Sequence, residues 1–431
     1  MKRFLPSLAL LGFALGAQAE TTVLHCERLL DVAGGEMLQQ QQVLIEGQRI
    51  TAAGAAAAIE QALEGREPDQ RVELVTCLPG LMDMHVHLKD QSSRNGYIKR
   101  FIRNEADHAL LAAHFARVTL EAGFTTVRDM GDTDYETVAL RNAITEGIAI
   151  GPRIYAAGKS IATTGGHADP TNGYREDLMG DPGPTEGVIN SPAEARKAVR
   201  YRYKRDVNVI KITATGGVLS LAKSGENPQF TQAELGAVIE AASEYGMAVA
   251  AHAHGAEGMK RAVLAGVRSI EHGTYMTPEI MDLMIKRGTF LVPTLLAGQF
   301  VSEKSQEEGY YPDVVRPKAA AIGPAINGTF SKAHAAGVPI AFGTDSGVSA
   351  HGDNAQEFAL MVENGMAALE AIRAATLSAA ELLLEEDSLG QIAPGYYADI
   401  IAVAGDPLAD ISLLQNVYFV MKDGVVYKHA D

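Results

Sequence analysis

Two histidines separated by a single residue are the first positions in this chain that could carry metal chemistry. His85 and His87 end a run of mainly apolar residues that begins at Pro79. Side chains two positions apart on a β-strand point to the same face, so both imidazoles would reach one site. Imidazole is a common ligand of zinc and related divalent metals. The pair by itself is weak evidence, because two ordinary polar residues at a strand end would look the same.

Further ligand-type side chains stand at the ends of later apolar runs. His252, His272 and Asp345 each end such a run. Lys211 lies within the apolar segment 209–213, and burying a lysine is costly unless the amine is paired or modified. A lysine that reaches solvent or an ion pair is the alternative. Residues of these types at so many matched positions predict a metal-dependent active site.

His254 follows two residues after His252 and would share its inward face. We interpret it as a structural residue or as support for the ligands, rather than as a ligand itself.

The residues between these positions indicate how the chain brings them together. Apolar, β-rich runs recur eight times, at 82–88, 125–131, 153–158, 209–217, 249–255, 269–273, 290–296 and 340–347. Segments with helical periodicity separate most of them, including 106–122, 191–205, 231–245 and 256–265. This alternation predicts an α/β protein with a (β/α)₈ TIM barrel, whose catalytic residues stand at the carboxyl ends of the strands. An open doubly wound sheet is the alternative, but no glycine-rich nucleotide-binding motif supports it.

Both ends of the chain read as short strands joined by turns. We therefore expect residues 20–78 and 390–431 to form one composite β-sandwich domain, and residues 79–389 to form the barrel. The chain has two cysteines, Cys26 and Cys77, both in the first of these segments. Export would permit a disulfide between them, and two buried free thiols are an alternative that the sequence supports at least as well.

Residues 1–19 have the pattern of a secretory signal peptide. Lys2 and Arg3 precede a short apolar run, and Ala17-Gln18-Ala19 offers small residues for cleavage. A buried N-terminal helix is the alternative. The pattern predicts a secreted or periplasmic protein with no membrane span after cleavage.

Composition limits the partners. The formal net charge is −16, and binding nucleic acid requires a basic face, so nucleic acid is not an expected partner.

Long polar inserts follow the third, fourth and seventh predicted strands, at 163–189, 221–230 and 298–317. Inserts of this length are often functional, so we expect them to select the substrate.

Taken together, these motifs resemble the amidohydrolase superfamily over nearly the whole chain. The resemblance rests on the opening from Pro79 to His87, on Lys211, His252 and His272, on Gly343-Thr344-Asp345, and on the closing segment 394–399. It implies two divalent metal ions, usually zinc. His85, His87 and Asp345 would hold the more buried ion and His252 with His272 the other. Lys211, carboxylated on its amine, would bridge them, and Asp345 would act as general base and acid for a bridging hydroxide.

Two loop motifs resemble one branch of that superfamily, which holds dipeptidases, carboxypeptidases and imidazolonepropionase-like enzymes. They are Gly165-Gly166-His167 and His351-Gly352-Asp353-Asn354. The likeness implies that His167 donates to the scissile carbonyl oxygen or binds substrate, and that His351 lines the pocket. Loop histidines in solvent are the alternative. We also expect Phe230, at the end of the insert 222–230, to contact the substrate.

The resulting hypothesis is an enzyme that hydrolyses the amide bond of dipeptides or N-acyl amino acids, including ochratoxin-type amides. Relatives commonly form homo-oligomers, so the resemblance favours one here. An imidazolonepropionase-like or deaminase reaction at a single metal is the alternative. Lys211 and the lack of a glutamate just after His252 argue against it. A non-catalytic binding or structural protein is a third possibility, which the intact set of six ligand positions disfavours.

Overall fold

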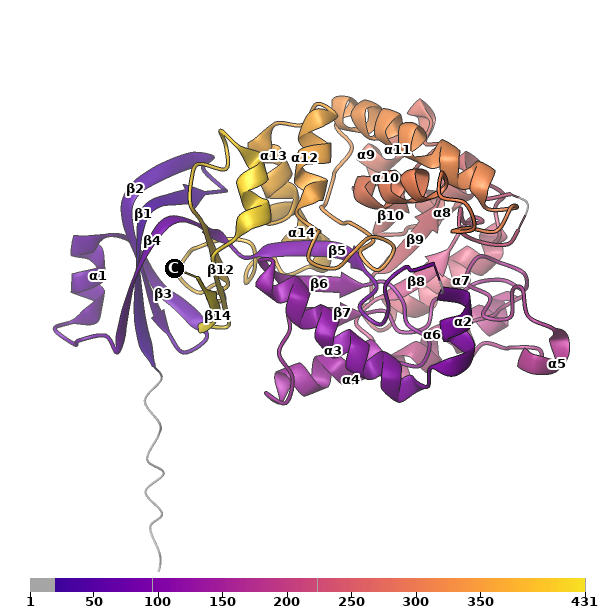
Figure 1. The fold of residues 1–431 in the computed structure, drawn as a ribbon, viewed down its shortest axis with the longest axis horizontal. Coiled ribbons are helices and arrows are strands. Elements are labelled where there is room, and N and C mark those ends of the chain that lie inside the picture. Colours follow the sequence, from indigo (N-terminus) through magenta and orange to yellow (C-terminus); the bar gives the residue numbers. More distant parts are fainter. Residues whose placement is uncertain (1–19, 95, 223, 431) are drawn as a thin grey trace, which may run out of the picture.

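The chain folds into a β-sheet part made from both of its ends and a larger α/β part between them (Figure 1). The computed structural model describes residues 20–430, except 95 and 223. The predicted signal peptide, residues 1–19, lies outside the described residues.

The terminal part is one seven-stranded sheet in the order β14-β13-β12-β4-β1-β2-β3. Its central strand β4 runs parallel to β1 and antiparallel to β12, so it joins the N-terminal strands to the C-terminal ones. The elements of this part are β1 (Thr21–Asp31), β2 (Glu36–Glu46), β3 (Arg49–Ala55), α1 (Ala56–Leu63), β4 (Gln70–Pro79), β12 (Ile400–Val403), η1 (Ile411–Asn416), β13 (Phe419–Lys422) and β14 (Val425–His429).

The predicted pairing of the two chain ends is confirmed, but hydrogen bonds define one continuous sheet rather than the two sheets of a sandwich. One apolar cluster joins the two ends, with Leu24 and Ile45 packed among Ile400 and Phe419. Cys26 and Cys77 lie in this cluster and form a disulfide between β1 and β4. The structure thus favours the disulfide over two free thiols.

The α/β part contains seven parallel strands in two sheets. The three-stranded sheet has the order β5-β6-β7 and the four-stranded sheet β11-β10-β9-β8. Nearly every residue of these strands is buried, as expected of parallel strands covered by helices. The strands are β5 (Leu81–Val86), β6 (Phe124–Asp129), β7 (Arg153–Ala156), β8 (Ile210–Thr213), β9 (Val249–Ala253), β10 (Ser269–His272) and β11 (Phe290–Val292).

Seven of the eight predicted strands are therefore present, and the assigned strands do not form a closed barrel. The eighth run, 340–347, is not a regular strand. It makes isolated parallel bridges, from Ile340 to Leu291 and from Ser346 to Val86. Asp345 has a left-handed backbone with φ of 58°, which interrupts the extended geometry that a strand needs.

Helices follow most of these strands and cover their outer faces (Figure 1). The four helical segments expected from periodicity are found as α3, α6, α7 and α8. Within the described residues, no helix is both long and apolar enough to cross a bilayer. The helices are α2 (Gly96–Ile102), α3 (Glu105–Glu121), α4 (Glu136–Thr145), α5 (Glu176–Met179), α6 (Pro192–Lys204), α7 (Gln232–Ser243), α8 (Ala256–Ala265), α9 (Pro278–Arg287), α10 (Leu295–Lys304), α11 (Arg316–Ala336), α12 (Gln356–Glu363), α13 (Ala368–Ala374) and α14 (Leu377–Leu383).

The insert after the seventh predicted strand is more ordered than we expected. Much of it belongs to α10 and to the loop before α11, and these two helices pack against each other. Gly298 and Gly323 permit the close approach, because a Cβ on Gly323 would lie 3.3 Å from the carbonyl oxygen of Gly298. The α10–α11 pair thereby forms a packed helical wall, and residues 305–315 of the insert form the loop between the two helices.

Candidate metal centre

The carboxyl ends of the parallel strands surround one cavity of about 290 Å³. Strands β5, β8, β9 and β10 and the segment 340–347 each supply side chains to it. The structure brings all six predicted ligands to this cavity, together with two further histidines. The six are His85, His87, Lys211, His252, His272 and Asp345, and the two others are His167 and His254.

The first group of donors joins the end of β5 to the segment 340–347. The ligand atoms of His85, His87 and Asp345 lie within 4.8 Å of one another. Asp345 Oδ1 is 3.3 Å from Nε2 of His87 and 3.5 Å from Nε2 of His85. This oxygen is buried and has no hydrogen-bond partner among the described residues. A buried carboxylate oxygen facing two imidazole nitrogens is the arrangement that a divalent metal would satisfy.

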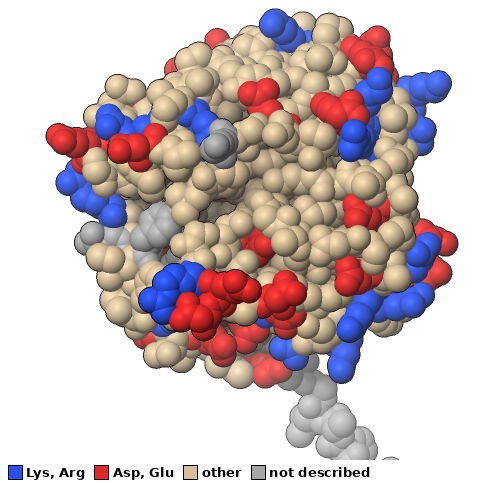
Figure 2. Space-filling model, turned by 90° about the vertical axis from the view of Figure 1, so that its right-hand side faces the viewer, with Lys and Arg blue, Asp and Glu red and all other residues tan. Residues whose placement is uncertain are grey.

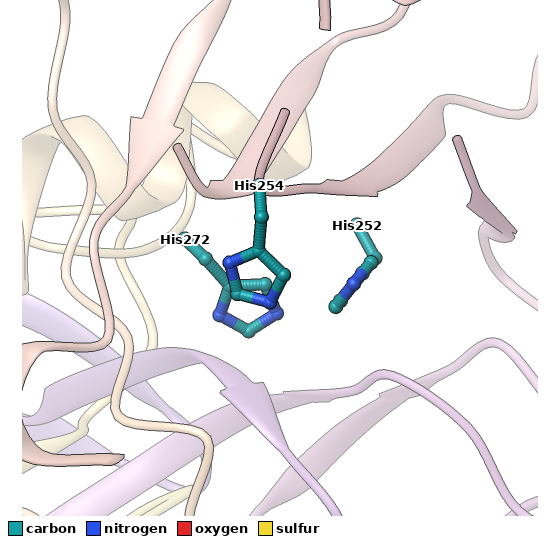
Figure 3. Close-up of side chains that lie close together, drawn as sticks. All are labelled: His252, His254 and His272. Atoms are coloured by element: carbon teal, nitrogen blue, oxygen red, sulfur yellow. The ribbon is translucent and has the colours of Figure 1, made fainter. Parts of the chain in front are cut away.

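The second group joins β9 to β10. The ligand atoms of His252, His254 and His272 also lie within 4.8 Å of one another, and Figure 3 shows the three rings turned toward a common space. His254 is therefore closer to the site than the sequence led us to expect. Its ring centroid lies 4.6 Å from that of His252 and 5.0 Å from that of His272.

Each of these histidines has one ring nitrogen held by a polar neighbour. Such partners fix the ring and leave the other nitrogen for a metal. The contacts are His85 Nδ1 to Glu271 Oε2 at 2.8 Å, His87 Nδ1 to the Gly131 carbonyl at 2.9 Å, His252 Nε2 to the Gly216 carbonyl at 3.1 Å, His254 Nδ1 to Thr274 Oγ1 at 2.8 Å, and His272 Nδ1 to Thr294 Oγ1 at 2.7 Å. The residues present therefore fit divalent metal ions.

A buried charge network supports His85. Glu271 accepts hydrogen bonds on Oε1 from Arg128 and on Oε2 from His85, and all three side chains are at most 1% exposed. Burial opposes ionisation, but Arg128 and His85 outweigh it and hold the pKa of Glu271 well below its ordinary value. Glu271 therefore presents a carboxylate to His85, which makes the ring a better electron donor.

A second buried carboxylate fixes the backbone around the ligands. Asp83 accepts hydrogen bonds from the backbone N–H of His85 and from the hydroxyl of Thr344. It also accepts from the side chain of Asn354. Asp83 thus ties the end of β5 to the segment that carries Asp345.

Lys211 is buried on β8 and forms no ion pair with any described residue. Burial lowers the pKa of its amine to about 8. Its charge also lowers the pKa of His85 in the first group and of His252 in the second. Lys211 therefore lies within electrostatic reach of both groups.

Three residues that border the cavity have a left-handed backbone, which only glycine adopts readily. They are His272 at φ 71°, Thr294 at 55° and Asp345 at 58°. Each such conformation costs on the order of 1 kcal/mol, and such residues concentrate at functional sites.

His167 reaches the cavity from the loop after β7. Its Nδ1 pairs with the hydroxyl of Ser220, and its ring lies 4.3 Å from that of His252. Gly217 makes this position possible, because a Cβ there would come within 2.1 Å of the His167 ring. His167 is therefore not a loop histidine in solvent.

Two predicted substrate contacts do not reach the cavity. Phe230 packs into the main hydrophobic core and is 2% exposed. His351 stacks on Phe115 at 4.4 Å, and its Nε2 bonds the carbonyl of Asp90. Neither residue lines the cavity. Phe230 contacts apolar side chains of the core, and His351 contacts Phe115 and the backbone of Asp90.

Sequence reasoning assigned no role to Glu271, Arg128 or Thr294. Arg128 carried a signal like that of Lys211, because it is a charged residue inside the apolar strand β6. Thr294 carried none, since its position depends on how the chain turns after β11.

Comparison with known proteins identifies the family of this chain. The amidohydrolase family model matches residues 76–427. Ochratoxinase of Aspergillus niger is 31% identical over 95% of this chain and 87% of its own length. A crystal structure of a Xaa-Pro dipeptidase with methionine bound in its active site is 51% identical, with a TM-score of 0.90 over 95% of this chain and all of that one. The crystal structure of A. niger ochratoxinase gives a TM-score of 0.85 at 29% identity, over 96% and 97% of the two chains.

Parallel strands that gather histidines and a carboxylate at their carboxyl ends are typical of hydrolases that could hold divalent metal ions. This chain belongs to the amidohydrolase family, in the branch that holds dipeptidases and ochratoxinase, and it is an enzyme that hydrolyses amide bonds.

Proposed function

We propose that this enzyme holds two divalent metal ions, and that it hydrolyses the amide bond of dipeptides or N-acyl amino acids. The observation that carries the proposal is the presence of two separate donor groups on one cavity, with Lys211 in reach of both. Two groups favour two ions over the single ion of the imidazolonepropionase-like or deaminase alternative.

In this proposal His85, His87 and Asp345 would hold one ion, and His252 and His272 would hold the other. Lys211, if carboxylated on Nζ, would serve both as an anionic ligand in place of an unpaired buried cation. When bound, divalent ions supply Lewis acidity and lower the pKa of water to about 7, and zinc suits a site rich in imidazole.

The chain's own groups then have distinct tasks. Asp345 takes the proton of the attacking water on its buried carboxylate and passes it to the leaving amine. His167, whose Nδ1 is engaged by Ser220, directs Nε2 at the carbonyl oxygen of the substrate. His254, the third member of the second group, would keep Nε2 available to the substrate, because Thr274 engages its Nδ1.

The solved relatives support an amide substrate that ends in an amino acid. They include the dipeptidase with bound methionine and a prolidase complexed with N-methylphosphonate-L-proline, a structure 30% identical with a TM-score of 0.85. A cavity of about 290 Å³ is at the small end of the range for ligand pockets, which suits a molecule of dipeptide size.

We further propose that the segment 340–347 completes a (β/α)₈ barrel. Its support is backbone pairing on both sides, with Ala341 N bonded to Leu291 O and Met84 N to Phe342 O.

Export to an oxidising compartment is also proposed. It is supported by the signal-like residues 1–19 and by the disulfide between Cys26 and Cys77. The homo-oligomer remains a prediction.

The decisive experiment combines metal analysis with a substrate library. The purified, metal-loaded enzyme is expected to contain two ions per chain and to release amino acids from members of a dipeptide and N-acyl amino acid library. One ion per chain, unchanged in Lys211→Ala, would refute the two-metal proposal. A fully loaded enzyme that cleaves no member of the library would refute the proposed substrates.

A further inference from the structure

One side of the cavity is apolar. The strand ends supply the histidines, Lys211 and Asp345, whereas the facing side is formed by α10, α11 and the loops after β8 and after Asp345. We call this side the apolar wall. Its residues are Val218, Leu219, Ala297, Gly298, Val301, Ile322, Ile326 and Val348.

Much of the apolar wall belongs to a hydrophobic cluster separate from the main core, whereas its residue Ile326 belongs to the main core. Val301 and Ile322 pack with Val315 and Ala319 in a group distinct from the main core, with Val218 against its edge. Because α10 and α11 pack on each other, the helical part of the wall belongs to the packed interior of the fold.

The wall offers no charged group to a substrate. Among the described residues that line the cavity, Lys211 and Asp345 are the only charged ones apart from the histidines, and both lie in the metal centre. Figure 2 looks onto this end of the α/β part, where mainly uncharged residues surround the central hollow and most charged ones lie nearer the edge.

Lys318 on α11 is a further cation, and it contacts the loop that carries Val218 and Leu219. Its Nζ donates to the carbonyl oxygens of Ser220 and Ala222, both at 2.8 Å, and of Gly217 at 3.3 Å. An ammonium group has three donors, so these bonds engage all of them. Lys318 therefore holds the loop after β8 in place and is not free to pair with an acidic substrate.

We propose that the apolar wall selects substrates with an uncharged, apolar side chain and rejects those with an acidic or basic one. The inference rests on the proposed function, which it extends from amides of amino acids to a class of side chain. A charged side chain placed against this wall would lose its water without gaining a partner, and that penalty is several kcal/mol.

The test compares dipeptides and N-acetyl amino acids that differ in one side chain. Methionine, leucine and phenylalanine represent the apolar class, and glutamate, lysine and arginine the charged one. Each side chain is placed in turn on either side of the amide. In at least one series the apolar members should exceed the charged members in kcat/KM by about 100-fold or more. Equal or better turnover of the charged members in both series would overturn the inference and leave the proposed function intact.

A binding measurement makes the test independent of turnover. Free methionine, leucine, lysine and glutamate are titrated into the metal-loaded wild-type enzyme by calorimetry. Preferential binding of the apolar amino acids would support selection by the apolar wall. If no amide is cleaved at the same time, only the proposed function fails. Equal binding of lysine or glutamate counts against the wall.

Substitutions on the apolar wall test whether this surface causes the selectivity for apolar side chains. Ile322→Asp places a carboxylate on the wall and should raise the kcat/KM ratio of lysine to methionine substrates by about 10-fold or more. Ile322→Asn has nearly the same shape without the charge and should not raise that ratio. Ile285→Asp, on the exposed side of α9, is the matched surface control and should behave as wild type. A ratio unchanged in Ile322→Asp, with metal content retained, would remove the wall from substrate selection.

Discussion

Glu271 Oε2 lies 2.8 Å from Nδ1 of His85, on the opposite side of the ring from the nitrogen that faces Asp345. The carboxylate of Glu271 therefore contacts one nitrogen of the His85 imidazole, and the proposed metal position faces the other nitrogen of the same ring. Arg128 bonds the other oxygen of Glu271, so this support is part of the buried core and not of the solvent-exposed surface.

Replacing Glu271 by glutamine should weaken metal binding. Glutamine keeps the size but loses the negative charge beside Arg128, and loss of such a supporting partner lowers metal affinity by about 10- to 100-fold. Competition with a chelator, followed by metal analysis, measures the effect. Glu257→Gln on α8, where the carboxylate is exposed and paired with Arg261, is the control. An affinity equal to wild type would show that Glu271 serves packing alone.

Replacing Lys211 by alanine should reduce the metal content from two ions per chain to one or fewer, because it removes the proposed ligand shared by the two groups. Metal uptake by the metal-free wild type should also rise with bicarbonate, which supplies the carbon dioxide for carboxylation, whereas uptake by Lys211→Ala should not. Lys204→Ala, an exposed change at the end of α6, is the control. Metal uptake by the wild type that does not change with bicarbonate would contradict the proposed carboxylation of Lys211.

Gly217→Ala tests the position of His167. The added Cβ would lie 2.1 Å from the His167 ring, so the ring must move away from its present place. If His167 donates to the substrate carbonyl, kcat/KM should fall by about 100-fold with unchanged metal content. Gly236→Ala in α7 meets no atom within 4 Å and is the matched control. Normal activity in Gly217→Ala would exclude His167 from the reaction.

The disulfide between Cys26 and Cys77 should contribute to stability by restricting the unfolded chain. The two residues are 51 positions apart, and removing a native disulfide costs about 2–5 kcal/mol. Urea unfolding of the double variant Cys26→Ala/Cys77→Ala, compared with wild type, measures the loss. A reducing agent should lower the wild-type midpoint and leave the variant unaffected. Equal midpoints would mean that the bridge does not form.

Glu357 should make stability depend on pH. Burial raises the pKa of this carboxyl to about 8 from an ordinary value of 4.5, although the backbone N–H groups of Leu295 and Leu296 lower it. Between these values the folded chain holds a proton that the unfolded chain has released. The stability linked to Glu357 is therefore fully present below pH 4.5 and is lost as the pH rises to about 8, by up to about 1.4 kcal/mol per pH unit.

Urea unfolding of wild type and Glu357→Gln at several pH values tests this linkage. The wild-type free energy of unfolding, minus that of the variant, should decrease from pH 5 to pH 8. Glu363→Gln, an exposed change on the same helix, should show a constant difference from wild type. A constant difference for Glu357→Gln as well would mean that the carboxyl is already ionised at pH 5.

The sequence by itself determined the types of the six candidate ligands, the strand-end positions of the histidines and Asp345, and the place of Lys211 within an apolar run. It could do so because a strand has a period of two and because catalytic residues stand where parallel strands end. Seven strands and the pairing of the chain ends followed from the same local patterns. The eighth strand did not, since Asp345 has a left-handed backbone whose N–H bonds the carbonyl of His85, a residue distant in the chain.

Only the tertiary structure could decide what surrounds the ligands. Glu271 reaches His85 across 186 positions, and Asp83 reaches Asn354 across 271, so no local pattern links them. Phe230 and His351 have the right chemistry for a pocket but point into packing instead. The apolar wall arises because α10 and α11 pack across the strand ends, and apolar residues at helical spacing look the same whether they face a core or a cavity.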